Sequence, residues 1–439
     1  MKMPTENAAS NSERALKHLW IAPVWPEPRS SAAGVRLQFL IQTLREHRPQ
    51  DSLILVSPAS SELLAKRETE ELFGIECQHF LPNDPRFDAF VREYSPDWVL
   101  FDRFHTEEQF GWRVREQCPR AFQVLDTSDL HFLRRAREKG FLLESPLLGS
   151  APFHLPADSK KDFLREMASI LRVDHAFVVS SFELELLESL HGFPRARASL
   201  LRWGVEKAPQ SERSWSDRSH LVMIGNFLHA PNRDSVHWVR RELWPKIRNK
   251  MPRAEIHVYG AYPAKQDFEL HDPRNGFYLK GSTDDSVKEI LSRYRVLLAP
   301  LRFGAGIKGK ILDAWSTRTA VVTSPIGAEG MIPSDSPFPG TVLSLDAQEA
   351  WAQEIFRLHE TEADWSKPTQ AGLVALREEY SCQKWQQEFL KTMESVLGCE
   401  KEPELLQEVL NAEGVHSKRY LSKYIELKEK LSSKFPGGL

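Results

Sequence analysis

The sequence predicts an α/β protein made of two Rossmann-like, doubly wound domains that face each other across a cleft. Short apolar segments alternate with amphipathic ones, the alternation stops at a polar stretch near the middle of the chain, and it then resumes. Strands that alternate with helices indicate parallel sheets covered by helices on both faces. In such sheets ligands bind beyond the carboxyl ends of the strands, so the expected ligand site lies between the domains.

Length and composition limit the class of protein. The 439 residues are 41% hydrophobic, which is enough for the cores of two or three domains. The formal net charge is only -3, which gives no global reason to expect nucleic-acid binding. The four cysteines form no CxxC pair, so neither a zinc site nor a disulfide framework is expected. The polar N-terminus lacks the apolar core of a secretory signal, and we therefore expect a cytoplasmic protein.

The elements of the first domain, residues 1–204, follow from short aliphatic or aromatic runs that precede helical patterns. Strands are expected at 19–22, 53–57, 98–101, 122–125 and 176–180. Helices are expected between them at 35–47, 62–73, 107–117 and 182–191.

The stretch 205–218, VEKAPQSERSWSDR, is polar and is interpreted as a linker. In the second domain, 219–380, strands are expected at 221–225, 255–260, 296–299, 320–323 and 342–345, and helices at 233–249, 285–292, 308–316 and 348–359. Trp385, Phe389 and Met393 recur at helical spacing, which predicts a further helix within 381–398. The charged extension 399–439 is expected to be a helical or partly disordered appendage.

The most informative stretch is 297–331, LLAPLRFGAGIKGKILDAWSTRTAVVTSPIGAEGM. A strand ends at Pro300, a glycine-bearing loop follows, and a helix starts near Lys308. Lys308 and Lys310 then stand in the first turn, where cations oppose the helix dipole, and an anion such as a diphosphate would resolve this conflict. Asp313, a turn and a half further on, is placed to accept two ribose hydroxyls. The alternative is an ordinary connection followed by a solvated helix face.

This stretch resembles the donor-binding motif of glycosyltransferase family 4 (glycosyl transferases group 1), in the variant GAGIKxKxLEA…VVTTPIGAEG. The matching residues are Gly304, Gly306, Lys308, Lys310, Ile311, Leu312, Pro325, Ile326, Gly327, Ala328, Glu329 and Gly330. The segment 220–232, HLVMIGNFLHAPN, resembles the opening of that family's second domain, FxGNFxxxPN, and includes Asn226.

The resemblance implies a GT-B fold and a retaining glycosyltransferase that uses a nucleotide-sugar donor. The acceptor hydroxyl is on a glycan, a lipid or a small molecule. The first domain is then the acceptor domain and the second the donor domain, with the helix at 381–398 crossing back to the first. Asn226, Gly304, Gly306, Asp313, Gly327, Ala328 and Glu329 are the implied donor-binding residues. No cofactor is expected, and because the chain has no convincing DxD-type carboxylate pair, no metal is expected either.

The sequence departs from the commoner family pattern at several positions. Ala305 stands where that pattern has a glutamate, and Asp313 is one methylene shorter than the usual glutamate. Arg318 replaces a small residue after the helix, which puts close packing there in question. An Arg and a Lys that usually follow the first strand of the second domain are missing, so Lys308 or Lys310 is expected to supply the charge for the phosphates.

In the first domain, residues 19–36 resemble the family's N-terminal glycine loop, which faces the donor phosphates, and Gly34 is the expected close-approach residue. The alternative is a strand-to-helix turn capped by Ser30 or Ser31. Polar clusters also follow two strands, at 101–105 and 125–131. The family places a His or an acidic residue here on the donor sugar, which makes Asp126, Asp129 and His131 catalytic candidates beside Lys308 and Lys310. The alternative for this cluster is a helix cap.

Two charged segments have open interpretations. The run 134–137, RRAR, is either a solvated helix face or a patch for an anionic acceptor. In the extension, Leu421, Tyr424, Ile425 and Leu431 form an apolar stripe beside basic residues, which indicates either peripheral membrane contact or a helix packed on the protein itself. Two other functions fit the architecture: a nucleotide-sugar epimerase, and a pseudo-enzyme that binds a nucleotide-sugar without turnover.

Overall fold

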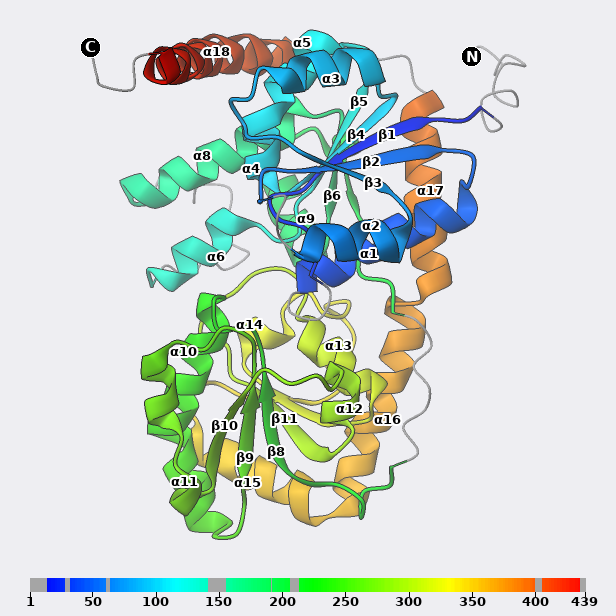
Figure 1. Cartoon of the computed structure of the whole chain (residues 1–439). Coiled ribbons are helices and arrows are strands. Elements are labelled where there is room, and N and C mark those ends of the chain that lie inside the picture. The colour runs from blue at the N-terminus through cyan, green and yellow to red at the C-terminus, as the bar shows by residue number, and fades with distance from the viewer. Residues whose placement is uncertain are drawn as a thin grey trace.

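The computed structural model describes residues 14–27, 32–60, 64–140, 155–190, 192–205, 213–398 and 405–434. Figure 1 shows two α/β domains, one above the other, with each sheet covered by helices. This arrangement confirms the predicted fold class.

The first domain contains a seven-stranded sheet in the order β3-β2-β1-β4-β5-β6-β7, and every recorded pairing in it is parallel. Leu19 of β1 pairs with both Ile54 and Val99, so the strand order reverses on either side of β1. The carboxyl edge beside this reversal is where such sheets bind ligands. The strands are β1 (Lys17–Ile21), β2 (Ser52–Ser57), β3 (Glu76–His79), β4 (Trp98–Asp102), β5 (Phe122–Asp126), β6 (His175–Val178) and β7 (Ala198–Leu200).

Helices cover both faces of this sheet because the strands are apolar on both sides. The expected helix at 107–117 begins with a short π-helix and continues as an α-helix. The helices of the first domain are α1 (Ala32–His47), α2 (Leu64–Phe73), α3 (Arg86–Tyr94), α4 (Phe104–Thr106), η1 (Glu107–Gly111), α5 (Trp112–Gln117), α6 (His131–Glu138), α8 (Ala157–Arg172), α9 (Ser181–Ser189) and η3 (Arg195–Arg197).

The second domain has a parallel sheet in the order β10-β9-β8-β11-β12-β13. Its strands are β8 (Ser219–Ile224), β9 (Ile256–Tyr259), β10 (Phe277–Gly281), β11 (Tyr294–Ala299), β12 (Ala320–Thr323) and β13 (Thr341–Val342). Its helices are α10 (Ala230–Trp238), η4 (Val239–Leu243), α11 (Trp244–Lys250), η5 (Lys265–Leu270), η6 (Pro273–Asn275), α12 (Val287–Leu291), α13 (Gly309–Ser316), α14 (Pro325–Ala328), α15 (Gln348–Glu360) and α16 (Glu362–Glu379).

The segment interpreted as a linker packs on the second domain in its last part. The Arg218 side chain is buried, and its guanidinium donates to the carbonyl oxygen of Thr317 and to the hydroxyl of Thr319. At the other end of the segment, Val205 forms an isolated parallel bridge with Ser381. Residues 206–212 lie outside the described part of the chain.

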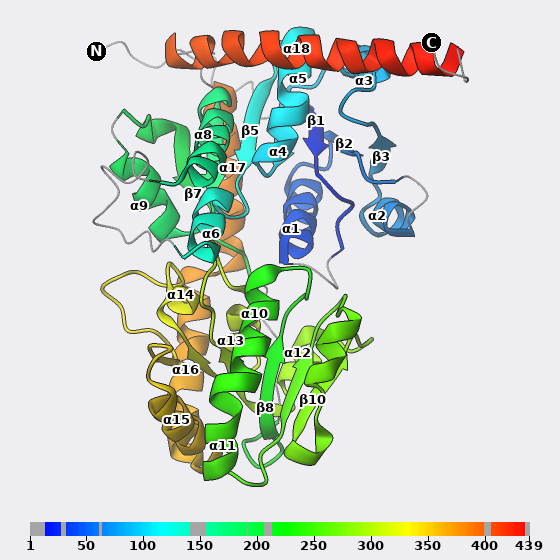
Figure 2. The same cartoon turned by 90° about the vertical axis from the view of Figure 1, so that its left-hand side faces the viewer.

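The chain returns to the first domain through α17 (Cys382–Gly398), as Figure 1 shows. Trp385, Phe389 and Met393 are buried in one cluster with Trp20 and Phe177 of the first domain. The Trp385 indole also donates to the carbonyl oxygen of Arg202 at 2.6 Å. Beyond α17, the extension forms α18 (Leu405–Lys434), which lies across the end of the first domain that is remote from the second (Figure 2).

Candidate functional site

The carboxyl edges of the two sheets face each other, and contacts between the domains define the candidate site. Gly309 opens α13 of the second domain, and a Cβ added there would lie 3.7 Å from the Cβ of Ala32, which opens α1 of the first. The Tyr262 hydroxyl of the second domain donates to the Glu27 carboxylate of the first at 3.1 Å. The amino ends of α1 and α13 therefore meet at the cleft.

Gly306, in the loop before α13, packs directly against the first domain. Its φ is +65°, and a Cβ there would lie 2.8 Å from the Cβ of Asp129. Its N–H donates to Oε1 of Glu183 at 2.8 Å, and the same oxygen accepts the N–H of Leu130 at 2.9 Å. Burial raises the pKa of Glu183 to about 7. One buried carboxyl group thus joins the glycine loop to the polar cluster after β5.

Lys308 holds this loop in place rather than facing an open site. It is the residue just before α13 and not part of its first turn. Its Nζ donates to the carbonyl oxygens of Gly306 at 2.8 Å and Glu329 at 3.2 Å. Burial lowers the pKa of Lys308 to about 8.

Lys310 is different, because its recorded partner is neutral. It lies in the first turn of α13, half-buried, and its Nζ donates to Oδ1 of Asn232 at 2.6 Å. The Asn232 amide in turn donates to the carbonyl oxygen of Asn226 at 3.1 Å. Partial burial lowers the pKa of Lys310 to about 8, and no ion pair to it is recorded within the described residues. In the described part of the chain, Lys310 is therefore a cation without a counter-ion.

Asp313 lies on the same helix as Lys310 and carries the opposite type of group, a carboxyl group. It follows Lys310 by three residues, so the two positions lie on the same side of α13. It is half-buried, and burial raises its pKa to about 6, with Lys288 opposing the effect. In the described part of the chain, no donor to its carboxylate is recorded. Among the described residues, α13 thus presents an ammonium and a carboxyl group that both lack an ion-pair partner.

Glu329 forms an ion pair across the domains. Both Nη atoms of Arg137 donate to its carboxylate at 2.7 Å, and Arg137 also donates to the carbonyl oxygen of Gly304 at 2.8 Å. Arg134 of the same run donates to Asp129. The interpretation of 134–137 as a solvated helix face is therefore wrong for these two arginines, because carboxylates of the cleft bind them.

Gly327 and Ala328 shape the turn after β12. They lie in the short helix α14, where the Ser324 hydroxyl accepts the N–H of Gly327. A Cβ at Gly327 would lie 1.9 Å from Oγ1 of Thr323, so this position excludes any side chain. Asn226 likewise fixes its own loop, since its Oδ1 accepts the N–H of Leu228 at 2.8 Å.

Asp129 and His131 form a dyad beside the glycine loop. Oδ1 of Asp129 lies 3.0 Å from Nε2 of His131. Burial alone would raise the pKa of Asp129, but Arg134 and His131 outweigh it and hold the pKa well below its usual range. The His131 ring also packs against His105, with 4.8 Å between centroids, and burial lowers the pKa of His105 to about 3. Asp129 is thus ionised and orients His131.

The other two candidates of the first domain have local partners. Asp126 is buried and accepts two hydrogen bonds from Arg36, at 2.7 and 3.0 Å, so the structure does not bring it to the dyad. A Cβ at Gly34 would lie 2.7 Å from the backbone of Glu27. The close approach at Gly34 is therefore to the segment that precedes α1. Ser30 and Ser31 lie outside the described residues.

Sequence reasoning missed Glu183 and His229 as residues of this site, and it named Arg137 only within the run 134–137. Glu183 follows β6 in the same way that Asp129 follows β5, so its position after a buried strand was a usable signal. The sequence did not distinguish Arg137 from the neighbouring arginines of its run. His229 precedes α10, and burial lowers its pKa to about 4, with Arg134 and Lys310 adding to the effect.

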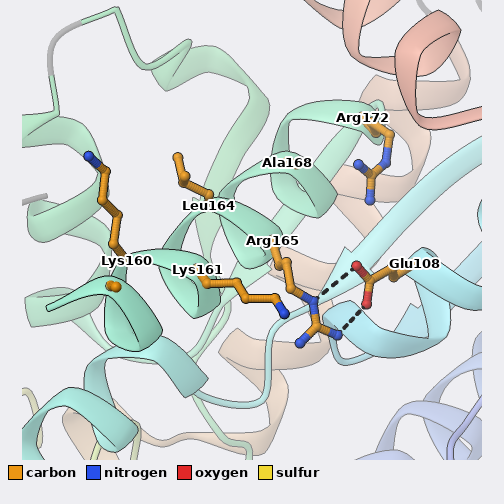
Figure 3. Close-up of a pocket in the computed structure, with 8 residues that line it drawn as sticks. Glu108, Lys160, Lys161, Leu164, Arg165, Ala168 and Arg172 are labelled. Atoms are coloured by element: carbon orange, nitrogen blue, oxygen red, sulfur yellow. Dashed lines mark hydrogen bonds and ion pairs between the residues drawn. The ribbon is translucent and has the colours of Figure 1, made fainter. Parts of the chain in front are cut away.

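A shallow pocket of about 500 Å³ lies elsewhere, on α8 (Figure 3). Its lining consists of Glu108, Ala157, Lys160, Lys161, Leu164, Arg165, Ala168 and Arg172, and includes none of the predicted site residues. Figure 3 shows Arg165 pointing to Glu108, with which it forms an ion pair at 2.6 Å.

Within the described ranges, no group of three or more His, Cys, Asp or Glu side chains is placed to hold a metal ion. The same residues include no helix that is both long and apolar enough to span a membrane.

Comparisons with known proteins agree with this geometry. Residues 218–361 match the family described as Glycosyl transferases group 1. No match was found among curated protein sequences. The structure resembles Anabaena HepE, solved with UDP and glucose, at a TM-score of 0.63 and 12% identity, over 87% of this chain and 100% of that one.

Two other solved structures are similar. Sucrose-phosphate synthase from Thermosynechococcus elongatus has a TM-score of 0.62 at 12% identity, over 88% of this chain and 100% of its own. A glycosyltransferase from Rickettsia africae has a TM-score of 0.62 at 11% identity, with the same coverage of both chains. The chain therefore has the GT-B fold of glycosyltransferases, and residues 218–361 of its second domain form a glycosyl transferases group 1 domain.

Proposed function

We propose that the protein transfers a sugar from a nucleotide-sugar to an acceptor hydroxyl with retention of the anomeric configuration, and that the donor binds on α13. The observation that carries the proposal is the pair Lys310 and Asp313, three residues apart on α13, each without an ion-pair partner in the described chain. A nucleoside diphosphate offers what both lack, since its phosphates are anionic and its ribose hydroxyls donate hydrogen bonds.

The diphosphate binds at the start of α13. The positive end of the helix dipole favours an anion there, and Lys310 adds a full charge. Lys308 acts indirectly, because its Nζ already joins the carbonyl oxygens of Gly306 and Glu329 and so fixes the loop. When the sugar–phosphate bond breaks, negative charge develops on the leaving diphosphate. These preorganised groups stabilise that charge without a metal ion.

The ribose binds at Asp313, whose carboxylate accepts its hydroxyls. The sugar then extends over the glycine loop toward Asp129 and His131, because Gly306 touches Asp129. Nδ1 of His131 is buried without a recorded partner, and a sugar hydroxyl would satisfy it. We assign Asp129 to orient His131 on the donor sugar. Asp126, already bound to Arg36, supports the fold of this edge.

Retention of configuration and the membership of glycosyltransferase family 4 rest on the motif at 304–330 and its GAGIK variant. The acceptor, a glycan, a lipid or a small molecule, approaches from the first domain. HepE was crystallised with UDP-glucose, which makes UDP-glucose the first donor to test on this chain.

The proposal is tested by incubating the purified chain with a panel of nucleotide-sugars and candidate acceptors, and analysing the products by mass spectrometry. Release of nucleoside diphosphate with formation of a glycosylated acceptor is the expected result. An epimerised nucleotide-sugar, or tight binding of a donor with no release by any acceptor, would contradict the transfer reaction.

A further inference from the structure

The long helix α18 packs on the first domain through polar side chains. The Gln407 side-chain amide donates to the carbonyl oxygen of Arg172 at 3.0 Å. Arg113 is fully buried and donates to the Ser422 hydroxyl at 2.9 Å and to the Glu426 carboxylate at 2.7 Å. The inner face of this helix is therefore held by hydrogen bonds and an ion pair.

The outer face of α18 is apolar. Tyr420, Tyr424 and Leu427 are 69%, 63% and 57% exposed, and Leu406 and Val409 are exposed as well. At 3.6 residues per turn, all five fall within one narrow stripe on the side opposite Gln407 and Ser422. A surface helix normally buries its apolar stripe, whereas α18 exposes its apolar stripe to solvent.

Two lysines border this stripe. Lys423 lies on one side of it and Lys428 on the other, and both are exposed. Between these two lysines, the described part of the outer face carries no acidic side chain. Glu408 and Glu426 share one helix position outside the stripe, and Glu426 binds Arg113. Apolar and tyrosine side chains flanked by lysines are typical of helices that lie in a lipid–water interface. Ile425 does not belong to the stripe, since it is half-buried on the inner side.

The position of α18 allows contact with a flat surface. In both views it lies across the outer end of the first domain, on the opposite side from the second domain (Figures 1 and 2). A second copy of the chain is a weaker match for this face, because the bordering lysines Lys423 and Lys428 would find no described acidic partner on an identical stripe. An anionic lipid surface matches both the apolar stripe and the bordering charge.

We propose that α18 docks the protein on an anionic lipid bilayer. The helix lies in the plane of the interface, with Tyr424 and Leu427 entering the headgroup region and Lys423 and Lys428 contacting lipid phosphates. The cleft then faces away from the bilayer. This inference does not depend on the proposed donor site, since no residue of that site lies on α18.

The test is co-sedimentation of the full chain with vesicles of phosphatidylcholine, with and without phosphatidylglycerol. Binding is expected only when phosphatidylglycerol is present, and it should weaken as salt is added. The variant Lys423→Glu/Lys428→Glu should bind at least about 25-fold more weakly, because each lysine near an anionic surface contributes about fivefold. The variant Tyr424→Glu/Leu427→Glu should lose measurable binding.

The matched control is Leu72→Glu, which places a charge at an equally exposed apolar residue on α2 of the same domain and should leave binding unchanged. Circular dichroism and nucleotide-sugar binding show whether each variant is folded. Absence of binding by the unsubstituted chain overturns the proposal, as does binding that survives both α18 variants. A dimer in analytical ultracentrifugation that Tyr424→Glu/Leu427→Glu converts to a monomer, without vesicle binding, also overturns it and assigns the stripe to a second copy.

Discussion

Gly306 of the donor loop and Asp129 of the first domain touch across the cleft, and a Cβ at Gly306 would lie 2.8 Å from the Cβ of Asp129. The same glycine has φ +65° and donates its N–H to Glu183. The donor loop is therefore positioned by the first domain, and its geometry depends on how closely the two domains approach.

Gly306→Ala should lower kcat/KM for the donor by about a hundredfold, because the added methyl group pushes the loop away from Asp129 and a small misplacement at a reacting centre is costly. The control is Gly74→Ala. Gly74 has φ +59°, but a Cβ there meets no atom within 4 Å, so this variant carries the backbone strain alone. The strain should cost about 1 kcal/mol of stability in each variant. Equal losses of activity in both variants would show that contact with Asp129 is unimportant.

The Arg137–Glu329 ion pair should stabilise the closed arrangement of the domains. Removing one partner of a buried ion pair leaves the other uncompensated, so Arg137→Ala should cost about 3 kcal/mol in urea unfolding. A double-mutant cycle with Glu329→Ala isolates the pair. We expect the double variant to be much less destabilised than the sum of the single variants. Additive losses would mean that the two side chains contribute independently.

Donor binding should depend on pH in a bell shape. The pKa of Asp313 is raised to about 6, so its carboxylate is lost as pH falls below that value. The pKa of Lys310 is lowered to about 8, so its charge is lost as pH rises above it. Affinity for a nucleotide-sugar, whose diphosphate does not titrate in this range, should be greatest between these values. Lys310→Arg should extend the alkaline limb, because arginine stays charged. An unchanged alkaline limb in that variant would remove Lys310 from the binding site.

Turnover should not require a divalent cation, because Lys310 and the amino end of α13 supply positive charge at the diphosphate. Initial rates measured with excess EDTA should match those measured with magnesium. A complete loss of activity in EDTA that manganese or magnesium restores would contradict this expectation.

The sequence predicted the interior of both sheets but missed edge strands. The structure contains β3, β7 and β10, which were not predicted, and each of them is the outermost strand of its sheet. An edge strand is less covered by other elements and pairs on one side only, so its sequence contains fewer apolar residues. The sequence of β3, ECQH, is an example. The predicted strand at 342–345 shortens to Thr341–Val342, which is also an edge. At Arg318 the backbone adopts a left-handed φ of +55°, which explains why a small residue is common there, and its guanidinium stacks over Trp365 instead.

The site residues that lie in a sequence motif were predicted. The site residues that only three-dimensional contacts bring together were missed. The order Lys308, Lys310, Asp313 indicated a helix start near an anion, and the structure places that helix start at the cleft. Sequence spacing does not reveal that Lys308 folds back onto two carbonyl oxygens whereas Lys310 does not. Likewise, Glu183 and Arg137 meet the donor loop only through the approach of distant segments.

Lys310 and Asp313 are proposed to recognise the two halves of one nucleotide, the diphosphate and the ribose. Isothermal titration calorimetry tests this recognition most directly. Titrations should compare a nucleotide-sugar with its 2′-deoxyribose analogue on the unsubstituted chain, Lys310→Ala, Asp313→Ala and the distant control Lys250→Ala. Lys310→Ala should lose about 1.5–3 kcal/mol of affinity for both ligands, since a charge-assisted hydrogen bond is removed. Asp313→Ala should bind weakly and lose most of its preference for ribose, whereas Lys250→Ala should behave as the unsubstituted chain. Unchanged affinity in Lys310→Ala together with unchanged ribose preference in Asp313→Ala would contradict the account.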